Sequence, residues 1–124
     1  MPQLTAIVID DDHGTVMVFS EYLQIKGIHV IGNGYDGMEA IRLYEKLKPD
    51  MVFLDVMMDG HDGFYALEKI KEIQPDAVVI MVTADITKET EEKLSKLNAS
   101  SIICKPYNMD KVMETVNKLF ASSV

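Results

Sequence analysis

The sequence predicts an α/β fold in which a five-stranded parallel sheet carries five helices on its two faces. Five short apolar segments recur along the chain, and most are rich in Val and Ile without alternating polar residues, as expected for strands buried on both faces. The stretches between these segments have apolar residues at helical spacing. Because strand and helix alternate five times, a parallel sheet covered on both faces is the favoured architecture.

The apolar segments follow one another at intervals that leave room for a helix each time. They span residues 4–9, 28–31, 51–54, 77–82 and 102–104. Each helix is expected to begin just after a residue type that commonly caps a helix N-terminus, and these residues are Asp12, Asp36, Asp62, Thr87 and Asn108. Right-handed crossovers leave few ways to build such a sheet, and we expect the strand order 2-1-3-4-5 of flavodoxin-like folds.

The composition limits the kinds of partner. The chain has 124 residues and a formal net charge of −8, and Arg42 is its single arginine, so no basic stripe is available for direct binding to nucleic acid. No apolar segment approaches the ~18 residues of a membrane span, so we expect no membrane insertion. The single Cys104 cannot form an internal disulfide, and its place in an apolar segment predicts a buried thiol. We expect one cytoplasmic domain over residues 1–124, with no output domain.

Polar residues close four of the five apolar segments. These residues are Asp10, Asp11, Asp12, Asp55, Thr83 and Lys105. In an open parallel sheet the carboxyl ends of the strands lie at one edge, and ligands bind beyond that edge. The polar residues are therefore expected to converge on one patch, with the acids at its centre.

The chemistry of this patch indicates a divalent cation and phosphoryl transfer. Three or more neighbouring carboxylates repel one another unless a cation joins them. Mg²⁺ is usually held by one or two carboxylates together with water and a substrate phosphoryl oxygen. In such a site Asp55 can act as a carboxylate nucleophile toward phosphorus, while Lys105 and Thr83 hold the oxygens being transferred. The product would be an aspartyl phosphate.

Five motifs, in this order, resemble the receiver domain of two-component response regulators of the chemotaxis-regulator type. They are IVIDDD at 7–12, FLDVMM at 53–58, DG at 62–63, VTA at 82–84 and CKP at 104–106, and the resemblance covers essentially the whole chain. It implies that Asp55 is the phosphoacceptor. It also implies that Asp10, Asp11 and Asp55 hold Mg²⁺ or Mn²⁺, with the backbone carbonyl of Met57 completing the metal site.

The resemblance implies further roles and partners. Thr83 would bind the phosphoryl group, Lys105 would form an ion pair with it, and a cis peptide bond would precede Pro106. A sensor histidine kinase or a histidine phosphotransfer protein would be the donor, and a downstream protein would be the target in trans. The domain would be a signalling phosphoacceptor rather than an enzyme, and a homodimer could form through the fourth helix, fifth strand and fifth helix.

Three positions depart from the family pattern. Ile102 stands at the switch position, where the family normally has Tyr or Phe, and a β-branched aliphatic side chain is stiff at χ1 and lacks a hydroxyl. The coupled movement of a Thr and an aromatic residue that is typical of the family therefore cannot be assumed for Thr83 and Ile102. Asp59 replaces a usual Pro, and Asn98 replaces a frequent Gly at a helix C-terminus. The alternative function is a phosphorylation-independent interaction module with a degenerate switch.

Other functional classes explain less of the sequence. Residues 32–37 match the G-x-G-x-x-G motif of dinucleotide-binding sites. The motif follows the second apolar segment, however, and the negative charge of Asp36 would repel the pyrophosphate of a dinucleotide. The stretch from Asp55 resembles an EF-hand loop but has Met57 and Ala66 where ligands are needed. A flavodoxin-like FMN carrier would not need the three acids at 10–12, and a D-x-D phosphatase would need an acid at residue 57.

Overall fold

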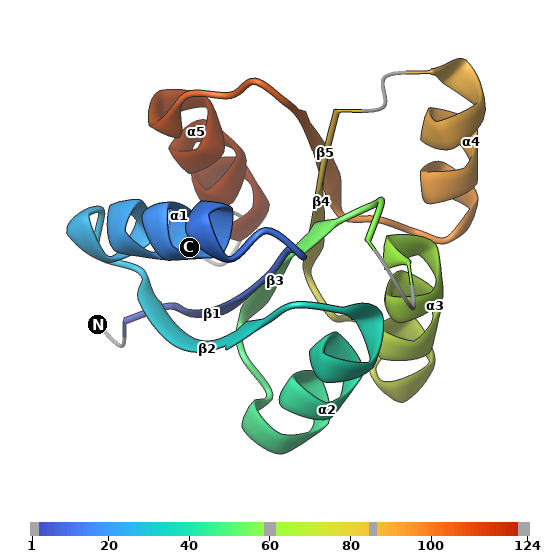
Figure 1. Cartoon of the computed structure of the whole chain (residues 1–124), viewed down its shortest axis with the longest axis horizontal. Helices are drawn as coiled ribbons and strands as arrows, with labels where there is room; N and C mark the ends of the chain where they lie inside the picture. The colour runs from blue at the N-terminus through green and yellow to red at the C-terminus, as the bar shows by residue number, and fades with distance from the viewer. Residues whose placement is uncertain (1–2, 59–61, 85–86, 122–124) are drawn as a thin grey trace.

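The computed structural model describes residues 3–58, 62–84 and 87–121 (Figure 1). Asp59, one of the three departures noted above, lies outside the described residues. In the described part, strands and helices alternate. The strands are β1 (Thr5–Ile9), β2 (His29–Gly34), β3 (Met51–Asp55), β4 (Val79–Thr83) and β5 (Ser101–Cys104). The helices are α1 (His13–Ile25), α2 (Gly37–Leu47), α3 (Gly63–Ile73), α4 (Lys88–Lys96) and α5 (Met109–Phe120).

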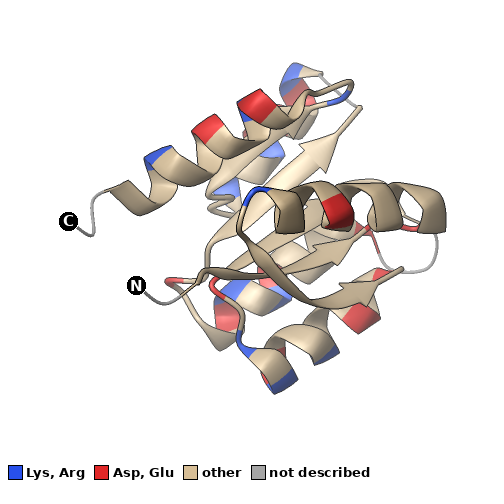
Figure 2. Cartoon of the chain, turned by 90° about the vertical axis from the view of Figure 1, so that its left-hand side faces the viewer, with Lys and Arg blue, Asp and Glu red and all other residues tan. Residues whose placement is uncertain are grey.

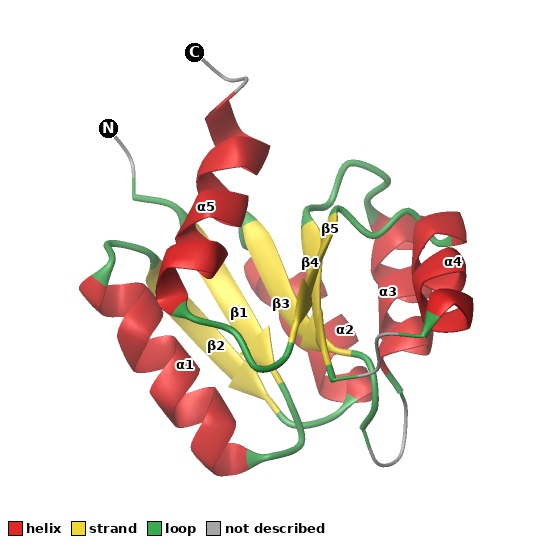
Figure 3. Cartoon of the chain, turned by 90° about the horizontal axis from the view of Figure 1, so that it is seen from above, coloured by secondary structure: helices red, strands yellow, loops and turns green. Residues whose placement is uncertain are grey.

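The strands form one parallel sheet in the order β2-β1-β3-β4-β5. Helices α1 and α5 cover one face of this sheet, and α2, α3 and α4 cover the other (Figures 1 and 3). The predicted flavodoxin-like, doubly wound fold is therefore confirmed. Within the described ranges, no helix has both the length and the apolar composition that crossing a lipid bilayer requires.

Alternate residues of the central strands pack into the two helical layers. On β1, Ile7 and Ile9 pack in the layer that contains α2, α3 and α4, whereas Ala6 and Val8 pack in the layer of α1 and α5. Every residue of β3 and β4 is buried. Burial on both faces explains why these segments lack the polar alternation of a sheet with one wet face.

Most of the expected helix caps are formed. One side chain at each of four N-termini accepts a hydrogen bond from the backbone N–H three residues later, and these caps are Asp36, Asp62, Thr87 and Asn108. Asp12 also occupies its expected N-cap position, at the start of α1, and its carboxylate accepts a hydrogen bond from the hydroxyl of Thr15. Asn98 has a φ of 65°, the left-handed conformation expected there.

The glycine motif at 32–37 has a packing explanation. Strand β2 extends beyond the predicted segment to Gly34, so the first two glycines lie in a strand rather than in a phosphate-binding turn. A Cβ on Gly32 would lie 3.0 Å from the side chain of Leu47, and one on Gly34 would lie 2.8 Å from that of Ile9. Both positions therefore lack a side chain because neighbouring side chains pack against the strand.

Gly63 marks the close return of the chain to the end of β3. Its N–H donates a hydrogen bond to the carbonyl of Val56 at 2.7 Å. A Cβ at this position would overlap the backbone carbonyl oxygen of Asp55 and lie 2.7 Å from the Cα of Val56. Backbone atoms cannot yield as the end of a flexible side chain can, so a glycine is required beside Asp55.

Replacing Gly63 with Ala should therefore lower the free energy of unfolding by about 3 kcal/mol, measured by urea denaturation. Gly14→Ala is the matched control, because a Cβ on Gly14 lies 3.8 Å from its nearest neighbour, an oxygen of Asp12. That change in a helix should be neutral or stabilise the protein by up to about 1 kcal/mol. Equal effects of the two substitutions would contradict the overlap.

Candidate functional site

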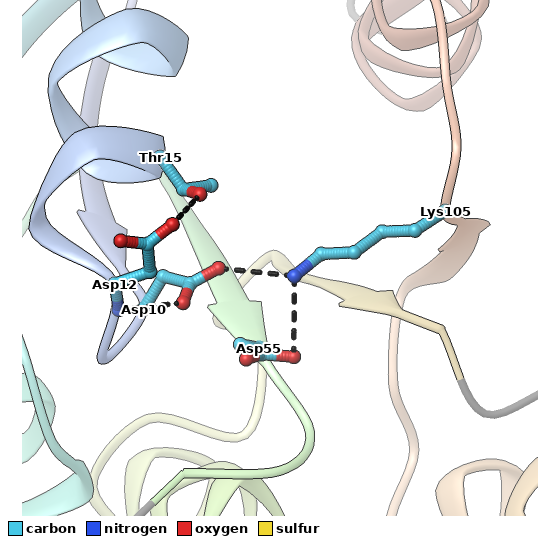
Figure 4. A network of polar contacts seen from close by, with 5 residues as sticks. All are labelled: Asp10, Asp12, Thr15, Asp55 and Lys105. Atoms are coloured by element: carbon cyan, nitrogen blue, oxygen red, sulfur yellow. Dashed lines mark hydrogen bonds and ion pairs between the residues drawn. The ribbon is translucent and has the colours of Figure 1, made fainter.

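Residues from three strands meet at the carboxyl edge of the sheet (Figure 4). Asp10 follows β1, Asp55 ends β3, and Lys105 follows β5. The backbone N–H of Lys105 donates to the carbonyl of Thr83 at 2.7 Å, which ties the end of β5 to the end of β4. The predicted convergence is therefore present for these residues, which the strand order brings together from distant parts of the chain.

The ammonium group of Lys105 lies between two buried carboxylates. Its Nζ donates a hydrogen bond to Oδ2 of Asp10 at 3.1 Å and lies 3.8 Å from Oδ1 of Asp55. Asp10 and Asp55 are only 6% and 7% exposed. Such burial makes this ion pair far less screened by solvent than a surface pair would be.

Asp11 adds a third carboxylate from the exposed side of the site. Asp10, Asp11 and Asp55 each offer a carboxylate oxygen, and these oxygens lie within 4.8 Å of one another. One ammonium cannot balance three negative charges, so the cluster keeps an excess of negative charge. Carboxylate oxygens are the ligands that hard divalent cations prefer, and the donor set therefore fits Mg²⁺.

Burial and the neighbouring acids both make the ionised form of Asp55 less favourable. Burial raises its pKa from 3.8 to about 6, and the negative charge of Asp10 adds to the rise. The ammonium of Lys105 and the backbone N–H of Met57 act in the opposite direction, and Asp11 adds a smaller upward contribution. The folded chain therefore holds the Asp55 carboxylate in an unfavourable place when no further cation is present.

The neighbouring charges respond in the expected directions. Burial alone would lower the pKa of Lys105, but Asp55 and the hydrogen-bonded Asp10 outweigh it, so the pKa is raised. The hydroxyl of Thr15 is the main cause that holds the pKa of the exposed Asp12 below its ordinary value. Asp12 is thus turned toward Thr15, while Asp10 faces Lys105 (Figure 4).

Thr83 and Ile102 lie on β4 and β5 and face a cavity next to α4. Thr83 is 1% exposed and ends β4. Ile102 is half-buried on β5, opposite Met81. A cavity of about 150 Å³ lies between these strands and α4, and its lining comprises Thr83, Thr87, Thr90, Glu91, Leu94, Ile102 and Cys104. The predicted switch position therefore lines a space that adjoins Thr83.

The expectation of a buried thiol is wrong. Cys104 is exposed although it lies in an apolar segment. It is the last residue of β5, and β5 is an edge strand of the sheet. The short apolar segment predicted the strand correctly, but it did not reveal that the strand end lies at the rim.

Two further predicted site features lie on the loops. Met57 is 60% exposed, and its backbone N–H donates a hydrogen bond to the carboxylate of Asp55. The metal-binding role of its carbonyl stays a prediction. The bond between Lys105 and Pro106 is cis, the isomer that the resemblance implies.

Several aromatic residues near the site were not predicted. The ring of His13 stacks on that of Tyr35, with ring centroids 3.8 Å apart and planes within 2°. Phe19 makes edge-on contacts with Phe53 and with Tyr107. The only sequence signal for Tyr107 is that it follows the Lys-Pro pair, and this signal does not reveal its contact.

Comparisons with known proteins agree with this geometry. The family model of the response regulator receiver domain matches residues 6–117. Protein CcdB of Bacillus subtilis strain 168 is 34% identical over 113 residues, which cover 91% of this chain and 94% of that protein. The chemotaxis protein CheY of Thermotoga maritima is 30% identical over 113 residues, with the same coverage of 91% and 94%. A chain in the crystal structure of the CheX-CheY-BeF3-Mg complex from Borrelia burgdorferi superposes with a TM-score of 0.90 at 28% identity, covering 94% of this chain and 89% of that one.

The raised pKa of Asp55 predicts how stability depends on pH in the metal-free protein. Below pH 3.8 the Asp55 carboxyl group is protonated in both the folded and the unfolded chain. Between pH 3.8 and about 6 it ionises in the unfolded chain but stays protonated in the folded chain, so the free energy of unfolding falls. It stays lower at higher pH. Asp55→Asn should remove this loss and raise the free energy of unfolding at pH 7 by on the order of 1–3 kcal/mol, with little gain at pH 4.

Urea denaturation in the presence of a chelator, at several pH values, measures this effect. Glu45→Gln is the matched control, because it removes one negative charge from an exposed position of α2. It should bring no comparable gain between pH 4 and pH 7. A loss of stability at pH 7 in Asp55→Asn would mean that the carboxylate is structural.

Proposed function

The chain belongs to the response regulator receiver domain family, and from this membership we propose that it accepts a phosphoryl group on Asp55 in a Mg²⁺-dependent step of two-component signalling. The observation that carries the proposal is the placement of one ammonium among three carboxylates. Lys105 contacts Asp10 and Asp55, and Asp11 completes the acid cluster. We propose a phosphoacceptor role in signalling rather than that of an enzyme with a separate substrate.

Asp55 supplies the nucleophile. One of its carboxylate oxygens forms a bond to phosphorus while the bond from phosphorus to the imidazole nitrogen of a phosphohistidine breaks, and the electron pair of the broken bond stays on that nitrogen. With a pKa of about 6 the carboxyl group is mostly ionised at neutral pH, so the nucleophile is available. Its burial leaves little competing solvent around the attacking oxygen.

The neighbouring side chains stabilise the charge that moves. Asp10, Asp11, Asp55 and the carbonyl of Met57 would hold Mg²⁺, which when bound supplies positive charge to the phosphoryl oxygens. Lys105 is placed to transfer its ion pair from the Asp55 carboxylate to the phosphoryl group attached there. The hydroxyl of Thr83 would donate to a second phosphoryl oxygen. Ile102 lines the same cavity as Thr83, so a movement of Thr83 toward the phosphoryl group would change the space next to Ile102.

A protein donor and a protein target fit the surface next to the site. Helix α1 starts directly after the acids, and Glu21 is its one Asp or Glu, with no Lys or Arg (Figure 2). Its exposed large apolar residues are Met17, Val18, Tyr22 and Ile25, which are 59%, 51%, 48% and 75% exposed. An exposed apolar surface with a single charged residue is typical of a protein-binding site. We propose that a cytoplasmic sensor histidine kinase or histidine phosphotransfer protein docks there, and that the phosphorylated chain then acts on a downstream protein.

Incubation with Mg²⁺ and acetyl phosphate tests the proposed function. We expect the intact mass to increase by one phosphoryl group, because the carboxylate of Asp55 is the attacking group. Chelation of Mg²⁺ and Asp55→Asn should each abolish the increase, whereas Asp76→Asn, at an exposed position, should leave it. No mass increase in the wild type would favour the phosphorylation-independent interaction module.

Val18→Asp tests the docking surface separately from the chemistry. A charge in the centre of an apolar interface should slow phosphoryl transfer from a histidine kinase that phosphorylates the wild type by about tenfold or more. The rate with acetyl phosphate should stay unchanged, because the small donor needs no docking surface. Ile73→Asp, at a 42% exposed position of α3 on the opposite face of the sheet, is the matched control and should affect neither rate. Equal slowing of both donors by Val18→Asp would contradict docking on α1.

A further inference from the structure

Three aromatic rings connect the elements that carry the site. Phe53, two residues before Asp55, meets Phe19 of α1 edge-on, with ring centroids 4.9 Å apart. Phe19 in turn meets Tyr107 edge-on at 5.3 Å. Tyr107 stands two residues after Lys105. The rings thus join β3, α1 and the segment after β5, and edge-on pairs of this kind contribute beyond the area they bury.

Phe19 and Tyr107 also separate two spaces. On the inner side a cavity of about 10 Å³, room for one water at most, lies beneath the acids, and Asp10 and Asp55 line it together with both rings. On the outer side a groove of about 520 Å³ lies between α1 and the start of α5, and the same two rings line it. The ring of Tyr107 therefore stands between the small cavity beneath Asp10 and Asp55 and the groove at the protein surface.

We propose that Tyr107 is a positioning residue for Lys105, because its ring, packed against Phe19, fixes the segment that aims the ammonium at Asp10 and Asp55. The consequence for phosphoryl acceptance rests on the proposed function. The positioning of Lys105 itself does not.

The backbone around Lys105 has two points of attachment. On one side its own N–H bonds to the carbonyl of Thr83. On the other side the chain continues through Pro106 to the half-buried ring of Tyr107. A lysine side chain is long and flexible, so its head stays in place only if its backbone is held and its partners are near. Loss of the ring removes the second attachment and opens the space beneath the acids.

Amine labelling measures the position of Lys105 without any phosphodonor. The rate at which an acetylating reagent modifies Lys105, followed by peptide mass spectrometry, should rise about fivefold in Tyr107→Leu, since the ammonium leaves its carboxylate partners more often. Tyr107→Phe keeps the ring and should label like the wild type. Phe120→Leu removes a half-buried ring at the far end of α5 that packs in the same core layer, and it should not change the labelling of Lys105.

The rate of phosphoryl acceptance from acetyl phosphate then tests the consequence. Tyr107→Leu should slow it about tenfold at saturating Mg²⁺, as expected for a misplaced charged group, while Tyr107→Phe restores the rate. Once Lys105 is replaced by Ala, adding Tyr107→Leu should bring no further slowing, because the ring acts through the lysine.

Unchanged labelling of Lys105 in Tyr107→Leu, or the same increase in Phe120→Leu, would overturn the proposal. Additive slowing in the double variant would overturn it as well. If the wild type takes up no phosphoryl group, the proposed function has failed, and the labelling result still decides whether Tyr107 positions Lys105.

Discussion

Repulsion among carboxylates at the edge of the sheet is the constraint on which the site depends. The parallel strand order brings Asp10 and Asp55 to neighbouring strand ends, and burial denies both groups the solvent that would screen them. Lys105 offsets part of this repulsion, but burial and the charge of Asp10 together still raise the pKa of Asp55. The folded chain therefore has an excess of negative charge at the place where a metal ion would bind during phosphoryl transfer. This arrangement costs stability, as is common where function and stability compete.

The features that depend on local sequence could be predicted. Unbroken Val- and Ile-rich segments predicted strands buried on both faces, and the residues directly after them predicted the edge where Asp10, Asp55 and Lys105 meet. Cap residues such as Asp36 and Asn108 were predictable because a cap bonds within its own first turn. These features need only the order of the elements and the direction of the strands.

The features that depend on which side chains face one another could not be predicted in this way. Whether Cys104 is buried depends on its place at the end of an edge strand, and the sequence does not say how far the neighbouring layer extends. The hydrogen bond from the hydroxyl of Thr15 to Asp12 joins two side chains, and the residue types at these positions do not predict it. The contact between Phe19 and Tyr107 joins residues from opposite ends of the chain, and spacing carries no information about such a pair.

The sequence separation within the site has a consequence for the way the protein is made. Asp10 and Lys105 are 95 positions apart, and β5 joins the sheet only at its edge, beside β4. Lys105 is synthesised after Asp10, Asp11 and Asp55, so the nascent chain carries the three acids before the lysine that pairs with Asp10 and Asp55 exists. Docking of β5 brings the ammonium of Lys105 to Asp10 and Asp55, so this step of folding is favoured by charge as well as by the burial of apolar surface.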